Sequence, residues 1–167
     1  HVIIYTNGSK TPGEELVDIL KGFRRVDIYV SIDGYKEINE YIRYGSDWKN
    51  TIHVLKKWKE TGLHTLVSAL ISAYSVPHLK RFIQWAKEFR VEVSLVELSF
   101  PEYLRASVLP QETLDKAYND IKSNGYDVLT KILLHKKHNH VPTVKIFTDV
   151  IDNKKNQKYD EIKGLYI

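Results

Sequence analysis

Ser31, Asp33 and Arg43 are the side chains whose types and spacing could do chemistry. The stretch VDIYVSIDG, residues 26–34, alternates apolar and polar residues and then breaks at Asp33 and Gly34. Ser31 and Asp33 lie two apart on one predicted strand, so their side chains point the same way. Parallel α/β sheets present ligand-binding groups at the carboxyl ends of their strands. The pattern therefore predicts a ligand site at this edge, with Arg43 able to fold back over it.

The same residues also fit an interpretation without a ligand. Asp33 can cap a turn through its own backbone, and Gly34 can supply the backbone freedom that the turn needs. Arg43 would then pair with Glu40 or Asp47 on the surface. Both interpretations stay open at the level of sequence.

Four further polar side chains are candidates for the same site. Thr6 and Asn7 end the first predicted strand, and Ser68 lies on the third. Glu97 lies inside an apolar strand, where a carboxylate must face a lumen or find a partner. Glu97 is therefore either a contact to cofactor or substrate or one half of a buried salt bridge.

Metal chemistry finds little support in this sequence. It contains no cysteine, which excludes disulfides, thiolate metal sites and cysteine nucleophiles within the chain. His135, His138 and His140 do not have the i, i+4 spacing of a helical metal-ligand pair, and lysines intervene. We expect these histidines at a solvated helix end and no metal ligand in this chain.

Strand-like and helix-like segments alternate through the first 99 residues. Such alternation predicts an α/β fold with a parallel sheet and right-handed crossovers, its helices on one face only if the sheet is an arc of a barrel. Strands are predicted near 2–6, 26–32, 65–71 and 92–98, and helices over 13–23, 47–62 and 76–89. The last helix directs Leu79, Phe82, Ile83 and Ala86 inward.

The pattern changes after residue 99. A loop or edge segment is predicted over 101–110, followed by helices over 111–125, about 126–137 and 142–162. We therefore expect a barrel-like core at 1–110 and a helical extension packed on it at 111–167.

Composition excludes several classes of protein. A chain of 167 residues with 43% apolar content has room for one core, and it has no apolar run long enough to cross a bilayer. The net charge of +4 is spread along the chain rather than gathered in a basic stripe with stacking aromatics. We expect no nucleic-acid or membrane partner and a cytoplasmic location. The absence of an initiator methionine suggests a part of a longer protein.

Five motifs occur in register along the chain: TNG, VSIDG, EYIRYGSDW, AYSVPHL and FPEYLRASVLP. In order and approximate spacing they resemble the motifs of radical S-adenosylmethionine enzymes, in particular the subgroup with a shortened C-terminal extension called the twitch domain. The resemblance extends over about residues 2–162. It implies a partial (β/α)6 TIM-like barrel, in which the four predicted strands are strands three to six, followed by C-terminal helices.

The resemblance also implies roles for the polar residues at the strand ends. In the family, such residues lie near the ribose or the methionyl carboxylate of S-adenosylmethionine (AdoMet), and an arginine in the next segment can pair with that carboxylate. Ser31, Asp33 and Arg43 stand at those positions, and the remaining candidates are Thr6, Asn7, Ser68 and Glu97.

The sequence departs from the family in two motifs. Family members carry a CxxxCxxC motif that holds a [4Fe–4S] cluster and a Gly-Gly-Glu-Pro turn that contacts the methionine amine, and this sequence has neither. We therefore expect no catalytic residue and no tightly bound cofactor in this chain. A longer parent would hold the cluster, cleave AdoMet reductively to a 5′-deoxyadenosyl radical and modify a peptide or small-molecule substrate.

Two further expectations follow. A barrel that begins at its third strand exposes the apolar strand VIIYT, which predicts self-association through that edge. The alternative function is a non-catalytic α/β module that keeps the fold for binding or assembly.

Overall fold

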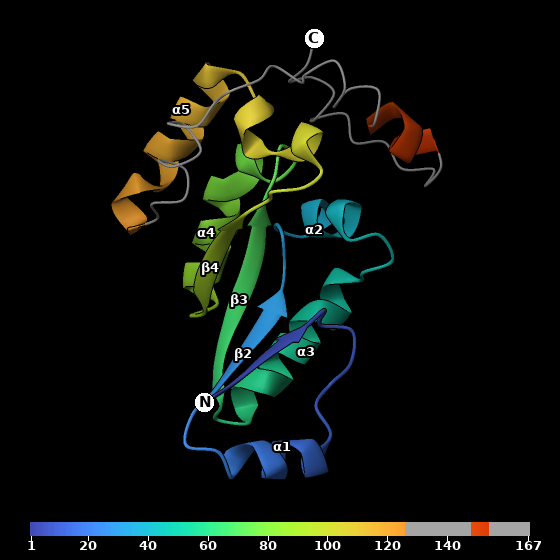
Figure 1. Ribbon diagram of the computed structural model, residues 1–167, viewed down its shortest axis with the longest axis vertical. Coiled ribbons are helices and arrows are strands. Elements are labelled where there is room, and N and C mark those ends of the chain that lie inside the picture. Colours follow the sequence, from blue (N-terminus) through green and yellow to red (C-terminus); the bar gives the residue numbers. More distant parts are fainter. Residues whose placement is uncertain (126–147, 154–167) are drawn as a thin grey trace. The chain divides into compact units, whose positions relative to one another are not determined.

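The computed structural model describes residues 1–125 and 148–153. Figure 1 shows its helices and strands. The chain divides into two compact units. Unit 1 comprises His1–Ala69 and Arg81–Ser94, and unit 2 comprises Leu70–Lys80 and Leu95–Ile167. The predicted boundary between a core and a helical extension near residue 110 stays a prediction.

The strands form one parallel four-stranded sheet in sequence order, as predicted. Ile3 lies opposite Asp27, and Ser31 lies opposite Ser68. The β-branched and aromatic residues of these segments favour extended backbone on a pleated sheet. The strands are β1 (Val2–Thr6), β2 (Val26–Ser31), β3 (His64–Ile71) and β4 (Glu92–Glu97).

The predicted helices over 13–23, 47–62, 76–89 and 111–125 are also present, with short 3-10 turns in two of them. Among the described residues one α-helix was not predicted, α2 (Glu37–Ile42), and the segment predicted as a loop or edge over 101–110 contains two 3-10 turns, Glu102–Leu104 and Ala106–Val108. Residues 148–153 are helical, while the rest of the helix predicted over 142–162 and all of the helix predicted over 126–137 lie outside the described residues. The other helices are α1 (Glu14–Lys21), α3 (Trp48–Glu60), α4 (Leu79–Glu88) and α5 (Gln111–Ile121).

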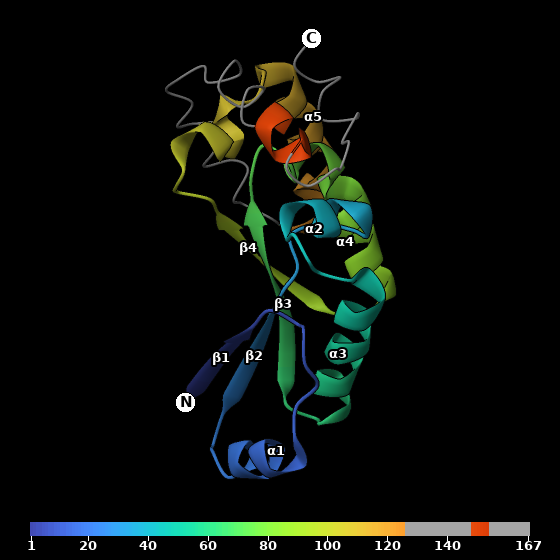
Figure 2. The same ribbon diagram turned by 90° about the vertical axis from the view of Figure 1, so that its right-hand side faces the viewer.

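In unit 1, the helices α2, α3 and α4 lie on one side of strands β1 to β3 (Figure 2). On that side β2 buries Ile28 and Val30 completely, and β3 does the same with Val67. The four inward positions predicted for α4 are all at most 2% exposed, Phe82 and Ile83 among them. This face of the sheet is the core of unit 1.

The opposite face of β1 carries exposed apolar side chains. Ile3 is 50% exposed and Tyr5 67%. Tyr5 stacks on Tyr29 of β2, with ring centroids 4.9 Å apart. Helices on one face and an open second face are what an arc of a barrel predicts, whereas a doubly wound sheet has helices on both faces.

Helix α1 buries only some of the apolar residues of the segment 13–23. Val17 and Leu20 are buried, while Leu16, Ile19 and, just after the helix, Phe23 are each more than 40% exposed. In both views α1 lies beyond the amino ends of the strands rather than across a sheet face (Figures 1 and 2). A helix in that place covers a narrower stripe than one that packs flat on a sheet.

A charged cluster closes the amino ends of β2 and β3. The side chain of Asp27 is 4% exposed and lies 2.7 Å from Nε2 of His1, 2.8 Å from Nδ1 of His64 and 3.1 Å from a terminal nitrogen of Arg25. The hydrogen bond with His64, followed by that with Arg25, holds the pKa of Asp27 below its ordinary value of 3.8. The cluster therefore stabilises the fold only while Asp27 is ionised.

Asp27→Asn is expected to lower the stability of the chain at neutral pH, and this loss should shrink under acid conditions. A carboxyl group whose pKa is depressed on folding contributes stability above its unfolded pKa of 3.8, and the contribution is lost as the pH falls through the folded value. Urea midpoints of both proteins between pH 7 and pH 3 measure the effect. Asp18→Asn, at an exposed position on α1, is the control. A difference between Asp27→Asn and wild type that does not change with pH would contradict the account.

Unit 2 has its own apolar centre. Leu109, Leu114 and Ile121 are fully buried, and α5 packs on the 3-10 turn Val76–His78.

Among residues 1–125 and 148–153, no helix is both long and apolar enough to span a bilayer.

Candidate functional site

The carboxyl end of β2 brings two hydroxyls together. Ser31 is the last residue of β2 and lies opposite Ser68 of β3. The N–H of Ile32 donates to the carbonyl of Ser68 over 3.0 Å, which fixes this register to the end of the strand. Ser31 and Ser68 therefore meet as neighbours, and both are half-buried.

Asp33 follows immediately and turns the chain toward α2. Its backbone N–H donates to Oδ1 of Asn39 over 2.9 Å. Asn39 is 1% exposed, and its Nδ2 lies 3.4 Å from the hydroxyl oxygen of Ser46. Glu40, the next residue of α2, accepts a hydrogen bond from the N–H of Trp48. The short helix is thus held by side-chain contacts to the segments on either side of it rather than by its own length.

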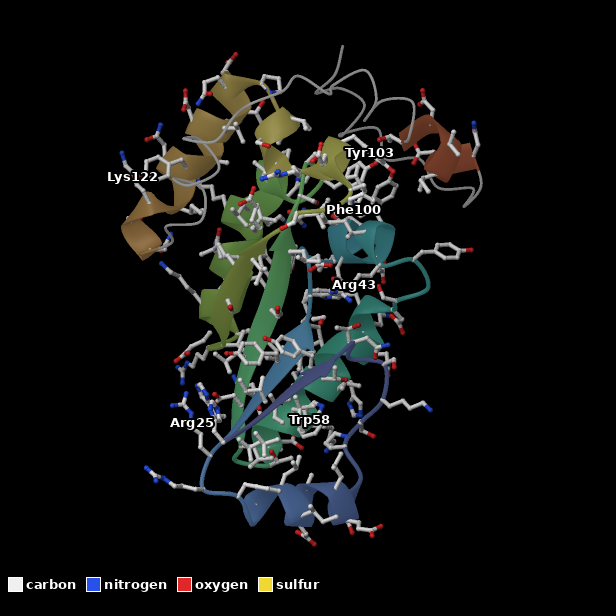
Figure 3. All side chains as sticks on the ribbon, in the orientation of Figure 1. Arg25, Arg43, Trp58, Phe100, Tyr103 and Lys122 are labelled. Atoms are coloured by element: carbon white, nitrogen blue, oxygen red, sulfur yellow. The ribbon has the colours of Figure 1, made fainter. Side chains whose placement is uncertain are left out.

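Arg43 caps α2 and points back to the end of β2 (Figure 3). Its Nε lies 2.8 Å from Oδ2 of Asp33, and the side chains are 27% and 4% exposed respectively. Nε is buried and not aligned for a hydrogen bond, so at this atom the pair is held by charge. The predicted surface pairings of Arg43 with Glu40 or Asp47 are therefore replaced by a pairing within the site.

A hollow of about 620 Å³ opens beside Arg43. It lies where β1 ends, between the turn after β1, the segment after α2 and the start of α3. Its lining is mostly polar, and Arg43 and Asp47 are the charged side chains among the described residues that line it. The lining residues are Asn7, Gly8, Ser9, Arg43, Tyr44, Gly45, Ser46, Asp47, Asn50 and Thr51.

Thr6 and Asn7 shape one wall of this region. The hydroxyl of Thr6 accepts the N–H of Gly8 over 3.3 Å, and Oδ1 of Asn7 accepts the N–H of Ser9 over 3.1 Å. Gly8 has φ +70°, and a Cβ there would lie 3.2 Å from Val30. Both predicted side chains therefore stabilise the turn that ends β1, and Asn7 also lines the hollow.

Glu97 belongs to unit 2 and forms an ion pair. Its Oε1 lies 2.8 Å from a terminal nitrogen of Arg105, and both side chains are 32% exposed. Of the two interpretations of Glu97, the salt bridge is present, although it is half-exposed rather than buried.

The described residues contain no group of three or more His, Cys, Asp and Glu side chains that could hold a metal ion. His135, His138 and His140 lie outside the described residues.

Asn39, Ser46 and Asn50 were not among the site residues predicted from the sequence. Asn39 occupies a helical position four residues before Arg43, which is the spacing of two side chains on one helix face. That spacing could have revealed Asn39, but only once α2 had been predicted.

Comparison with known proteins finds likeness in structure alone. No protein-family model matches the sequence, and no curated protein matches it significantly. Among solved structures, native anSMEcpe with bound AdoMet superposes with a TM-score of 0.55 at 16% identity, covering 78% of this chain and 38% of that chain. The structure of anSMEcpe with AdoMet and a bound peptide gives 0.53 at 16% identity, covering 74% of this chain and 38% of that one.

These neighbours define the fold of this chain. anSMEcpe is a radical AdoMet enzyme, an anaerobic sulfatase-maturating enzyme. The parallel four-stranded sheet with its flanking helices is consistent with part of the TIM-like barrel of such enzymes. This chain spans 38% of the length of those neighbours.

Proposed function

We propose that this chain is the later part of the barrel of a radical AdoMet enzyme and forms half of its AdoMet site. The observation that carries the proposal is the place of Arg43. This arginine lines a polar hollow at the strand ends of a sheet whose structural neighbours bind AdoMet. Strand ends of parallel sheets are the usual place for ligands.

The residues at this edge fit the polar groups of AdoMet. A guanidinium binds a carboxylate through two parallel hydrogen bonds, so Arg43 suits the methionyl carboxylate. Ser31 and Ser68 offer neighbouring hydroxyls, each of which can both donate to and accept from ribose hydroxyls. Asn7, which lines the hollow together with Arg43, offers an amide.

The chain does not fit the iron–sulfur cluster that drives such enzymes. Clusters of this kind are held by cysteine thiolates, and the chain has no cysteine. In the proposed cytoplasmic parent, another segment supplies the thiolates that hold the cluster. Reductive cleavage of AdoMet then yields the 5′-deoxyadenosyl radical. This chain by itself is then inactive.

The substrate of the parent is a peptide or a small molecule. One structural neighbour is bound to a peptide, which favours the first of these. Residues 111–167 follow the barrel-like part in sequence, as the twitch extension does in that subgroup, and we propose this segment as the corresponding extension.

The isolated chain is expected to bind AdoMet with a dissociation constant near the millimolar range, about −4 kcal/mol. The contacts of the cluster and of the Gly-Gly-Glu-Pro turn are missing, and each remaining hydrogen bond contributes only about 1–3 kcal/mol. Calorimetric titration measures the constant. Supplying the cluster-bearing segment of the parent should tighten binding by orders of magnitude.

Two outcomes would refute this assignment. Micromolar binding by the isolated chain would mean that it forms a complete site of its own. No tightening on addition of a cluster-bearing segment would favour the alternative, a non-catalytic α/β binding or assembly module.

We also propose that copies of this chain associate through the edge of β1. β1 pairs only with β2 in the described sheet. The N–H of Val2 donates to the carbonyl of Arg25 over 2.9 Å. Peptide groups alternate in direction along a strand, so those of Ile3 and Tyr5 point away from β2. An uncharged apolar edge of this kind is a template for another strand.

The wild-type chain is expected to associate at high concentration. Ile3→Lys is expected to weaken this association by about tenfold or more, because a charged side chain on an edge strand blocks strand pairing. Sedimentation velocity over a concentration series measures the effect. Ile19→Lys, at a similarly exposed position on α1, is the matched control. A wild-type chain that stays monomeric at high concentration would contradict the proposal.

A further inference from the structure

The side chain of Asp33 is too deeply buried to contact a ligand directly. Its side chain is 4% exposed, and its Oδ2 lies 2.8 Å from Nε of Arg43. A carboxylate this deeply buried needs a cationic or hydrogen-bonding partner, and Arg43 provides one. Arg43 is the more exposed of the two, at 27%, and it is the one that lines the hollow.

Asn39 connects the same two residues through the backbone. Its side-chain oxygen accepts the N–H of Asp33 over 2.9 Å, and its carbonyl accepts the N–H of Arg43 over 2.8 Å. Asn39 therefore sets the distance between the end of β2 and the end of α2. The residue is 1% exposed, so water cannot readily replace these bonds.

The guanidinium of Arg43 keeps donors for a ligand. Asp33 lies on the Nε side, which leaves the two terminal nitrogens as a fork for an incoming carboxylate. Arg43 is the cation among the described residues that line the hollow, and the lining carboxylate, Asp47, already accepts the N–H of Lys49. Without Asp33, the long arginine side chain would have many conformations of similar energy, and fixing one would cost affinity.

We propose that Asp33 and Asn39 are positioning residues that hold Arg43 at the wall of the hollow, where its terminal nitrogens bind the carboxylate of an amino-acid-like ligand. The identity of that ligand as AdoMet rests on the proposed function. The positioning role rests on the contacts of Asp33, Asn39 and Arg43 alone. Asp33 then acts through Arg43 and does not itself touch AdoMet, although the resemblance implied a place near the ribose or the methionyl carboxylate.

The test compares two ligands that differ only in the carboxylate. AdoMet and decarboxylated AdoMet are titrated into the full 167-residue chain, labelled with ¹⁵N, and affinities are taken from chemical-shift changes. Wild type is expected to prefer AdoMet by about tenfold, the effect of one charge-assisted carboxylate contact. Asp33→Asn and Arg43→Ala are expected to bring this ratio close to one, whereas Arg24→Ala, at an exposed position, leaves it unchanged.

The ratio of the two affinities distinguishes a loss of Arg43 positioning from a general loss of folding. A general loss of structure lowers both affinities together and does not change their ratio. Added guanidinium ion should restore the preference in Arg43→Ala, where Asp33 can hold it, and should fail to do so in the Asp33→Asn/Arg43→Ala double variant. A preference for AdoMet that survives Asp33→Asn would overturn the proposal.

A second measurement needs no ligand. The ¹⁵N–¹H nuclear Overhauser effect at Nε of Arg43 is expected to match that of ordered backbone in wild type and to fall sharply in Asp33→Asn. An unchanged value in Asp33→Asn would overturn the positioning role. If this value falls in Asp33→Asn but wild type binds AdoMet and decarboxylated AdoMet equally well, the positioning role stands and the AdoMet assignment fails.

Discussion

Phe82→Ala is expected to lower the free energy of unfolding of the chain by about 3–5 kcal/mol, the usual cost of emptying a buried aromatic site. Phe82 is 1% exposed and stacks on Trp85, with ring centroids 5.6 Å apart. It lies on the face of α4 that packs against the sheet, so its loss leaves a cavity that the flanking strands and helices cannot close without moving. Chemical denaturation followed by tryptophan fluorescence measures the change.

Phe23→Ala is the matched control for Phe82→Ala. Phe23 belongs to the same unit but is 49% exposed, so about 1 kcal/mol is the expected loss. Equal losses in the two variants would mean that the side of the sheet covered by α4 is not the core of unit 1.

Gly34→Ala is the second substitution for which we expect a large loss of stability. A Cβ at Gly34 would lie 2.5 Å from Cγ2 of Ile38 and 2.9 Å from its Cβ. Ile38 is 3% exposed and has no room to retreat, so relief requires a shift of the backbone between β2 and α2. Overpacking of this kind costs about 1–3 kcal/mol. Because the shift moves the N–H of Asp33 away from Asn39, the preference for a ligand carboxylate should fall with stability.

Gly13→Ala is the matched control, because a Cβ at this position would meet no neighbouring atom. No atom lies within 4 Å of a Cβ built at Gly13, which precedes α1 in an extended conformation. The expected effect on stability is within about 0.5 kcal/mol, since reduced freedom of the unfolded chain offsets a poorer helix cap. Thermal unfolding of the two variants side by side measures the difference. A neutral Gly34→Ala would show that Ile38 can repack and that the turn is looser than its contacts indicate.

The sequence by itself determined the sheet and most of its helices. Alternation of strand-like and helix-like segments predicted four parallel strands in sequence order, and the apolar spacing of 76–89 predicted the buried face of α4 with Leu79 and Phe82 inward. These features depend on periodicity over many residues, where each residue adds to the same signal. The prediction that polar residues would meet at the strand ends followed from the same alternation, and Ser31 and Ser68 do lie side by side there.

The tertiary structure alone decided how the site is arranged. Helix α2 is six residues long, too short for its own hydrogen bonds to stabilise it, and contacts of Asn39 with Asp33 and of Glu40 with Trp48, in the two flanking segments, hold it in place. The side chain of Arg43 was equally compatible with surface partners at i−3 or i+4. It pairs with Asp33 because the turn at Gly34 and the bonds of Asn39 bring the end of α2 back to the end of β2. Burial then favours this pair, since a carboxylate out of contact with water is stable only beside a cation.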